Sequence, residues 1–164
     1  MQHGFIKVGA AIPLVSVADT KYNTEQLIAM AHRAHEEGAE VTVFPELCIT
    51  GYTCGDLLTQ QTLLQEVENS VEEFSEATKE YDNIYIIGAP IYVCGALYNC
   101  ALVMQQGLIL GIVPKCYIPN YGEFSERRWF STGYNLRMED DIHYAGQWVH
   151  IGSYQIFHTA RYAF

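Results

Sequence analysis

The sequence predicts an α/β fold with a mixed sheet. Three short runs rich in apolar and β-branched residues, at 5–11, 41–44 and 84–89, have the composition of buried strands. Segments with apolar residues at helical spacing separate these runs, and alternating strands and helices are typical of parallel crossover units. A Gly-containing turn between two later apolar segments, 97–104 and 108–113, indicates an antiparallel hairpin in the same sheet.

The first crossover unit has clear boundaries. Its opening strand at 5–11 is followed by a loop and then by a helix that is capped at Asn23 or Thr24 and ends at Gly38. The strand at 41–44 follows the helix directly. This short connection is what a parallel crossover unit requires.

The second unit repeats the pattern over the next part of the chain. Segment 58–79 carries apolar residues on one helical face and glutamates on the others, which predicts a helix packed on the sheet. The strand at 84–89 follows and is closed by Pro90. The sheet therefore gains a third strand before the hairpin begins.

Irregular sequence and two further strands make up the last third of the chain. Periodicity disappears from 114–135, a loop rich in aromatic and charged residues, and long loops often carry functional sites. Two short strands are expected at 142–149 and 154–157, with Gly152 and Ser153 between them.

The composition describes one acidic globular domain. The 164 residues are 49% hydrophobic and 17% charged, enough to build one core. Nineteen acidic and nine basic residues give a net charge of -10, the wrong sign for binding nucleic acid or anionic membranes. No apolar run reaches the roughly 18 residues of a membrane span, and the N-terminus lacks a secretory signal. Five sparse cysteines indicate reduced thiols, so we expect a cytoplasmic protein.

Two charged residues that follow apolar strands are candidates for catalysis. Glu46 lies just past the strand at 41–44, and Lys115 lies just past the strand at 108–113. Ligands of open α/β sheets bind at the carboxyl ends of the strands. A partly desolvated carboxylate there can act as a general base, and a lysine can stabilise an oxyanion. The commoner alternatives are a capping or solvated glutamate and a strand-end lysine with its ammonium in water.

Two sequence motifs surround these residues. The first reads Phe-Pro-Glu-Leu-Cys-Ile-Thr-Gly-Tyr-Thr-Cys-Gly-Asp-Leu at 44–57; the second combines Pro-Lys at 114–115 with Ile-Pro-Asn-Tyr-Gly-Glu-Phe at 118–124 and Glu-Arg-Arg-Trp-Phe at 126–130. Together with the Tyr-Asn pair at 98–99, they resemble the nitrilase, or carbon–nitrogen hydrolase, superfamily, and within it the glutaminase domain of glutamine-dependent NAD synthetases. The resemblance covers nearly the whole chain. It implies a nitrilase-type α-β-β-α sandwich with a mixed sheet, here incomplete.

That family uses a catalytic triad of Glu, Lys and Cys. By resemblance, Glu46 takes the proton of the thiol, and Lys115 supports the tetrahedral intermediate that forms when the Cys attacks an amide carbon. A further carboxylate that family members carry after the lysine corresponds to either Glu123 or Glu126. The residues that match positions lining the glutamine pocket of the synthetases are Tyr52, Tyr121 and Phe124.

The nucleophile of the family has no counterpart in this sequence. It follows a later strand in a segment that reads approximately Glu-Ile-Cys-Glu-Asp, whereas this sequence finishes with Thr-Ala-Arg-Tyr-Ala-Phe at 159–164. We therefore expect residues 1–164 to be a partial nitrilase-like glutaminase domain, truncated before the nucleophile, without turnover and without the synthetase domain. The resemblance implies no cofactor for the glutaminase part, and ATP and Mg²⁺ only on the absent synthetase domain.

The five cysteines present are expected to be structural. Cys116 is adjacent to Lys115, but neighbours along a strand point to opposite faces, so both cannot face one pocket. Neither the cysteines nor the six dispersed histidines have the spacing of a zinc site. We therefore expect no metal site.

The activity implied for the parent enzyme is hydrolysis of glutamine to glutamate and ammonia, with the ammonia used for NAD synthesis. Two alternatives stay open: a nitrilase-type amidase fragment that acts on another amide, and a non-catalytic binding or scaffold protein that kept the surface of the sandwich. Glutamine is the expected ligand. A homo-oligomer is also expected, because strands late in the chain would lose partners and apolar cover.

Overall fold

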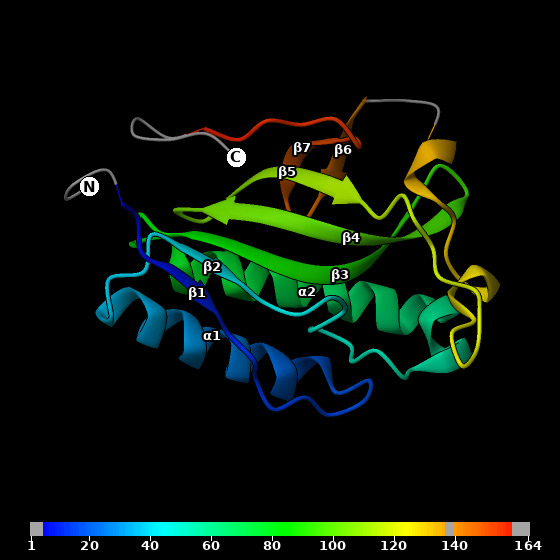
Figure 1. Cartoon of the computed structure of the whole chain (residues 1–164), viewed down its shortest axis with the longest axis horizontal. Helices are drawn as coiled ribbons and strands as arrows, with labels where there is room; N and C mark the ends of the chain where they lie inside the picture. The colour runs from blue at the N-terminus through cyan, green and yellow to red at the C-terminus, as the bar shows by residue number, and fades with distance from the viewer. Residues whose placement is uncertain (1–4, 137–139, 159–164) are drawn as a thin grey trace.

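A mixed sheet forms the centre of the molecule (Figure 1). The structure, a computed structural model, describes residues 5–136 and 140–158. Within these ranges the strand order is β1-β2-β3-β4-β5-β7-β6. The strands are β1 (Val8–Ala10), β2 (Val41–Val43), β3 (Ile84–Val93), β4 (Ala96–Gln105), β5 (Leu108–Pro114), β6 (Asp140–Tyr144) and β7 (Gln147–Ile151). The predicted α/β class with a mixed sheet is confirmed.

The first three strands are paired in parallel, as are β5 and β7 farther along the sheet. β1 pairs with β2 and β2 with β3, and the two crossovers carry the helices α1 (Thr20–Glu36) and α2 (Gln61–Thr78). Both helices lie on one face of the sheet (Figure 1). The chain enters α2 later than predicted, because Gly55–Thr59 form a separate 3₁₀ helix, η1.

Helix α1 begins earlier than the sequence predicts. The side chain of Asp19 accepts a hydrogen bond from the backbone nitrogen of Tyr22 at 3.1 Å, so Asp19 is the capping residue. Asn23 and Thr24, the two residues expected to cap the helix, are both buried inside it. Asn23 has partners outside the helix. Its Nδ2 donates to the carbonyl oxygens of Ser16 at 2.8 Å and Ile49 at 2.9 Å, which ties the loop before α1 to the loop after β2.

Strands β3, β4 and β5 form the antiparallel part. The predicted turn between β4 and β5 is confirmed, with positive φ at Gln106 (50°) and Gly107 (75°). A similar turn at Cys94 and Gly95 joins β3 to β4. Strand β3 is longer than predicted because it continues through Pro90. At this point β2 has already ended and only β4 flanks β3, so the missing N–H of a proline is tolerated.

The last strands differ from the prediction. The run at 142–149 is not one strand, because Ala145 and Gly146, with φ of 48° and 71°, form the turn between β6 and β7. The segment at 154–157, expected to be a strand, is irregular. It crosses the sheet face opposite the helices, where Gln155 Nε2 donates to the carbonyl oxygen of Ile112 at 2.7 Å.

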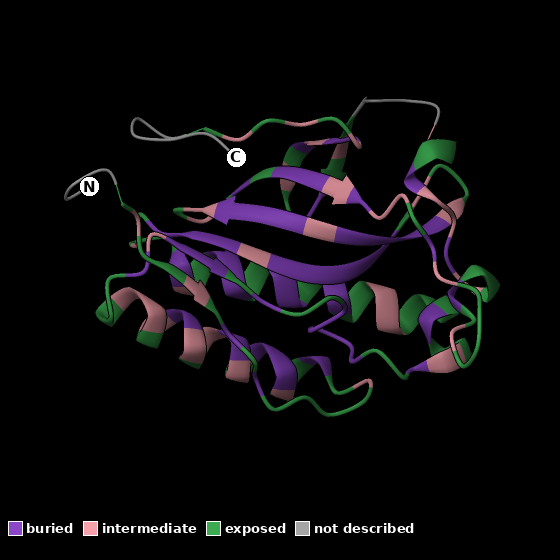
Figure 2. Cartoon of the chain, viewed as in Figure 1, coloured by how far each residue is buried: buried purple, intermediate pink, exposed green. Residues whose placement is uncertain are grey.

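The main core lies between the helices and the sheet (Figure 2). Phe74 of α2 and Tyr85 of β3 are fully buried there and meet edge to face, with ring centroids 5.6 Å apart. The opposite sheet face is less covered, and Val8 and Val43 are exposed. Neither helix described in the structure has the length and apolarity needed to cross a membrane.

One buried hydroxyl makes a test of this core possible. Within the described ranges, the hydroxyl of Tyr144 is buried and has no hydrogen-bond partner. We expect Tyr144→Phe to raise the free energy of unfolding by about 1 kcal/mol, because a buried polar group without a partner costs its desolvation. Tyr85→Phe is the matched control and should lower it, since the Tyr85 hydroxyl donates to the carbonyl oxygen of Ala31 at 3.2 Å. Urea denaturation of both variants tests this, and destabilisation by Tyr144→Phe would contradict it.

Candidate active site

Glu46 lies just after β2 in a backbone that β3 holds closely. The backbone nitrogen of Phe44 donates to the carbonyl oxygen of Ile86 at 2.8 Å, and Pro45 then ends the pairing. Behind this turn stands Gly88. A Cβ at Gly88 would lie 2.6 Å from the Cα of Glu46 and 2.5 Å from the next backbone nitrogen. Only glycine allows β3 to pass so close, and this approach positions the backbone that carries Glu46.

Lys115 directly follows β5 and reaches Glu46. Its Nζ lies 2.7 Å from Glu46 Oε2. The carboxyl ends of β2 and β5 therefore meet toward the same edge of the sheet, on the right in Figure 1. The structure brings together the two residues that the sequence placed at strand ends.

A second carboxylate, that of Glu126, binds the same ammonium. Both of its oxygens lie within 3.1 Å of Lys115 Nζ, and the residue is 3% exposed. It sits at the start of the 3₁₀ helix η2 (Glu126–Arg128) in the long loop. Glu123 is exposed. Between the two carboxylates that the sequence left open, the geometry places Glu126 at the lysine.

The electrostatics keep Lys115 charged. Desolvation alone would lower the pKa of Lys115. The hydrogen bonds from its ammonium to Glu46 and Glu126, together with the charges of these carboxylates, outweigh desolvation and raise that pKa above its ordinary value. Tyr52 completes the network by donating from its hydroxyl to Glu126 Oε1 at 2.7 Å. Burial of the phenol, together with this hydrogen bond and the carboxylate charge, raises the pKa of Tyr52, so the phenol stays a donor.

Asn99 of β4 is a member of the site that strand-end reasoning did not single out. Its Nδ2 donates to Glu46 Oε2 at 2.9 Å, and its carbonyl oxygen accepts from the backbone nitrogen of Lys115 at 2.8 Å. It therefore orients both residues of the ion pair. The available signal was a buried polar residue inside an apolar strand, because a buried amide needs hydrogen-bond partners.

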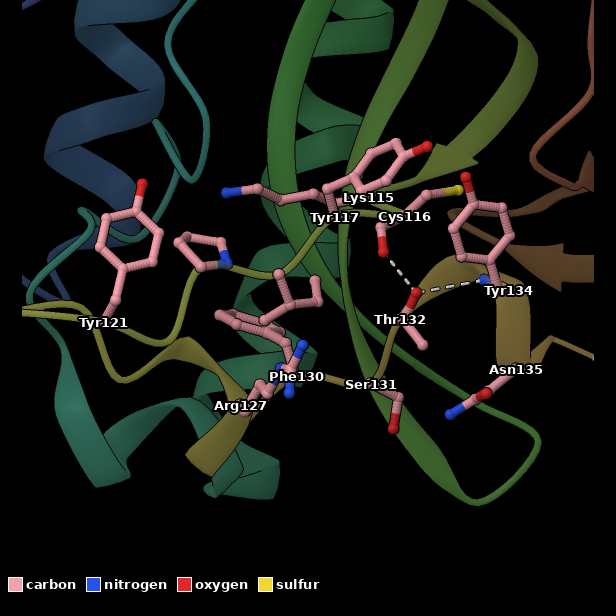
Figure 3. A pocket seen from close by; sticks show the side chains of 12 residues that line it. Lys115, Cys116, Tyr117, Tyr121, Arg127, Phe130, Ser131, Thr132, Tyr134 and Asn135 are labelled. Atoms are coloured by element: carbon pink, nitrogen blue, oxygen red, sulfur yellow. Dashed lines mark hydrogen bonds between the residues drawn. The ribbon is translucent and has the colours of Figure 1, made fainter.

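Two of the three expected pocket aromatics lie in the loop beside the lysine. Tyr121 is exposed and meets Phe124 edge to face, with ring centroids 5.7 Å apart. Tyr121 also lines a groove of about 920 Å³ next to Lys115 (Figure 3). Tyr52, by contrast, contacts Glu126 directly. The hydroxyl of Tyr52 is therefore already bound to a residue of the ion network.

The five thiols differ in how far they are buried. Burial raises the pKa of Cys48 to about 11 and also raises the pKa values of Cys54 and Cys100, which disfavours the reactive thiolate. Cys94 is exposed in the turn between β3 and β4. Cys116 points away from the ammonium of Lys115, as expected from strand geometry, and lies 3.3 Å from the hydroxyl of Ser153 (Figure 3).

Two histidines of α1, His32 and His35, take structural positions. His35 stacks on Tyr81 with ring centroids 4.0 Å apart, and its Nδ1 is 2.6 Å from Asn83 Oδ1. His32 meets the same tyrosine edge to face. In the part of the chain that the structure describes, no three His, Cys, Asp or Glu residues come together in a way that could hold a metal ion.

Comparison with known proteins places the chain in a family. The profile of the carbon–nitrogen hydrolases matches residues 8–154. The chain belongs to the carbon–nitrogen hydrolase family. Glu46, Lys115 and Glu126 all lie within the residues that the profile matches.

Sequence relatives of this carbon–nitrogen hydrolase include NAD synthetases. The glutamine-dependent NAD(+) synthetase of Mycobacterium tuberculosis is 37% identical over 132 residues, which are 80% of this chain and 19% of that protein. The corresponding protein of Aquifex aeolicus is 36% identical over 118 residues, 72% of this chain and 20% of that protein. The chain thus spans about a fifth of the length of these relatives.

Solved structures confirm the nitrilase-type fold. A glutamine-dependent NAD(+) synthetase from Cytophaga hutchinsonii superimposes with a TM-score of 0.84 at 24% identity, covering 94% of this chain and 26% of that one. An amidase from Nesterenkonia sp. gives a TM-score of 0.70 at 17% identity, covering 90% of this chain and 55% of that one. At these identities the likeness concerns the fold.

The ion network makes a prediction about the reactivity of Lys115. Because its pKa is raised, less of its amine is neutral at about pH 9 than in an ordinary lysine, and only the neutral amine is acylated. We expect acetic anhydride to modify Lys115 more slowly than the exposed Lys21. In Glu126→Gln one carboxylate is lost, so the pKa of Lys115 should fall and its acylation should accelerate, while Lys21 keeps its rate. Peptide mass spectrometry measures both rates; an unchanged Lys115 rate in Glu126→Gln would show that Glu126 does not control its charge.

Proposed function

We propose that Glu46, Lys115 and Glu126 are the base and lysine part of a glutaminase site. The parent enzyme would hydrolyse the side-chain amide of glutamine and supply ammonia for NAD synthesis. The observation that supports this is one ammonium held within 3.1 Å of two carboxylates at the carboxyl edge of the sheet. The NAD synthetases among the relatives, glutamine-dependent by name, support the choice of glutamine as the amide.

The geometry supports a division of roles. Among the described residues, both hydrogen bonds to Glu46 end on Oε2, so Oε1 is the oxygen that takes a proton from a nucleophile. Lys115 carries a fixed positive charge that stabilises the oxyanion formed when the amide carbon is attacked. Glu126 takes part neither in the proton transfer nor in the stabilisation of the oxyanion. It keeps Lys115 charged and in place.

We infer that none of the five cysteines supplies the nucleophile. Three thiols are buried with raised pKa values, Cys94 lies in the turn between β3 and β4, and Cys116 faces away from the ammonium of Lys115. We therefore propose that this chain binds the amide without hydrolysing it. In the parent enzyme, ATP and Mg²⁺ would act on a synthetase domain, in the cytoplasm.

Ligand binding tests the proposed function directly. We expect L-glutamine, titrated into ¹⁵N-labelled chain, to shift the backbone amide signals of Glu46, Lys115 and the loop at 121–126, because these residues surround the proposed site. Butyramide is the comparison for a different amide specificity. Shifts with butyramide alone would favour another amidase, and shifts with neither amide would favour a scaffold protein.

Turnover is tested separately on the same chain. We expect no release of ammonia from glutamine, and no adduct on any of the five cysteines after treatment with an electrophilic glutamine analogue, because no thiol is activated at the site. Intact-protein mass spectrometry measures the adduct. The urea-unfolded chain, treated with a general thiol reagent, is the control and should react at all five positions. One adduct formed by the folded chain would identify a nucleophile and refute the proposed inactivity.

We also propose that the chain self-associates. The sheet face opposite the helices exposes Val8 and Val43, and the segment that crosses this face turns Tyr154 and Ile156 outward. Exposed apolar residues on one face favour association, which a net charge of -10 slows without preventing it. Light scattering over a dilution series should give a mass above that of the monomer, and Ile156→Ser should lower it. A monomer mass at every concentration would rule out association.

A further inference from the structure

A cavity lies between β1 and the last turns of α1, on the face of the sheet that the helices cover. Its volume is about 280 Å³. Apolar side chains form most of its wall, among them Met30, Ala34 and Ala39. None of the residues that line it belongs to the Glu46–Lys115 site. The cavity is therefore a feature of the fold that the proposed glutaminase site does not use.

Thr42 of β2 brings a hydroxyl without a partner to this cavity. The residue is 1% exposed, and its Oγ1 has no hydrogen bond with any residue that the structure describes. Neighbouring residues of a strand point to opposite faces, and Val43 is exposed on the face away from the helices, so Thr42 faces α1. A buried hydroxyl without a partner is costly, so a group that bonds it from the cavity gains an interaction that the free chain lacks.

The hydroxyl of Thr42 is turned toward Gly9 of β1. The two residues are paired in the register of β1 and β2, and both line the cavity. A Cβ at Gly9 would have Thr42 Oγ1 as its nearest atom, at 3.4 Å, which is ordinary van der Waals contact. Because glycine has no side chain, β1 leaves the hydroxyl uncovered at this position, and an alanine would fit there and cover it.

Two cations and one carboxylate also line the cavity: Lys7, Arg33 and Glu37. Arg33 donates from Nε to Glu37 Oε1 at 2.8 Å, and Lys7 Nζ donates to the carbonyl oxygen of Glu37. The Nη nitrogens of Arg33 have no hydrogen-bond partner among the described residues, although a guanidinium carries five N–H donors. The side chain of Arg33 is 75% exposed, which places these free donors at the mouth of the cavity.

We propose that this cavity binds a small carboxylic acid that has an apolar body and a hydroxyl at its far end. The carboxylate binds Arg33 and the hydroxyl binds Thr42. A concave, mostly apolar site with a few polar groups at fixed places is typical of small-molecule sites. The orientation follows from the cost of burying a charge, because the carboxylate stays at the exposed mouth while the neutral hydroxyl enters the cavity. Binding of this acid is independent of the Glu46–Lys115 site.

Titration with two matched acids tests the assignment on the full chain. The probes are 6-hydroxyhexanoate and hexanoate, which differ only in the hydroxyl. In ¹⁵N-labelled chain, we expect both acids to shift the backbone amide signals of Gly9, Ala34 and Thr42, because these residues line the cavity. We expect 6-hydroxyhexanoate to bind about 3- to 10-fold more tightly than hexanoate, the usual gain from one hydrogen bond.

Four variants separate the two contacts. Thr42→Val removes the hydroxyl and should bind the two acids equally, and Gly9→Ala, whose methyl covers the hydroxyl, should have the same effect. Arg33→Gln should weaken the binding of both acids by about 10-fold, because a hydrogen bond to a charged group is lost. The control is Lys21→Gln, which removes the same charge from the exposed start of α1 and should change neither affinity.

Each contact can fail by itself. Equal affinities of the two acids for the unsubstituted chain would refute the contact with Thr42, and an equal loss in Arg33→Gln and Lys21→Gln would refute the contact with Arg33. Unshifted signals at Gly9 and Ala34 with both acids would overturn the site. Urea denaturation shows that a loss of affinity is not a loss of fold: Thr42→Val should unfold at no lower urea concentration than the unsubstituted chain, because the hydroxyl that it removes has no partner.

Discussion

The contact of Lys115 with two carboxylates is the constraint on which the site depends. Glu126 is nearly fully buried, and a buried carboxylate without a counter-charge is costly. Lys115 provides that charge and Tyr52 adds a hydrogen bond. The same ammonium binds Glu46 from the end of another strand. The turn after β2, the end of β5 and the long loop are therefore coupled through one nitrogen atom.

The sheet supplies the rigidity that this contact requires. Gly88 lets β3 pass directly behind the backbone of Glu46, where any side chain would collide with it. Asn99 bonds Glu46 through its side chain and Lys115 through its backbone. Gly88 and Asn99 belong to the neighbouring strands β3 and β4 in the middle of the sheet. Backbone pairing therefore helps to set the separation of Glu46 and Lys115, which does not depend on flexible side chains alone.

The long loop carries three charged side chains with different surroundings within a few residues. Glu126 faces inward to Lys115, Arg128 faces Asp56, and Arg127 between them lines the groove. The short 3₁₀ helix η2 turns these three consecutive side chains in different directions. One loop thus holds Lys115 in place, fastens itself to η1 and lines the groove.

The sequence by itself determined the fold class and the two strand-end residues. Runs of apolar residues, helical spacing and glycine turns are local, so they predicted the parallel and antiparallel parts of the sheet, and Glu46 and Lys115 followed from their places after strands. The resemblance to a known family added roles for them. Local patterns failed where distant contacts decide: Asp19 replaced Asn23 as the cap, because Asn23 is taken by backbone oxygens outside its helix.

Tertiary structure alone decided which further residues join Glu46 and Lys115. Glu123 and Glu126 have the same chemistry and lie three positions apart, and only burial against Lys115 distinguishes them. Asn99 joined the site through contact with Glu46, 53 residues away in the chain. Likewise, the turn at Ala145 and Gly146 was hidden inside an apolar run. The physical reason is that apolar patterning reports which residues leave water, whereas hydrogen bonds and ion pairs depend on which groups meet after the chain has folded.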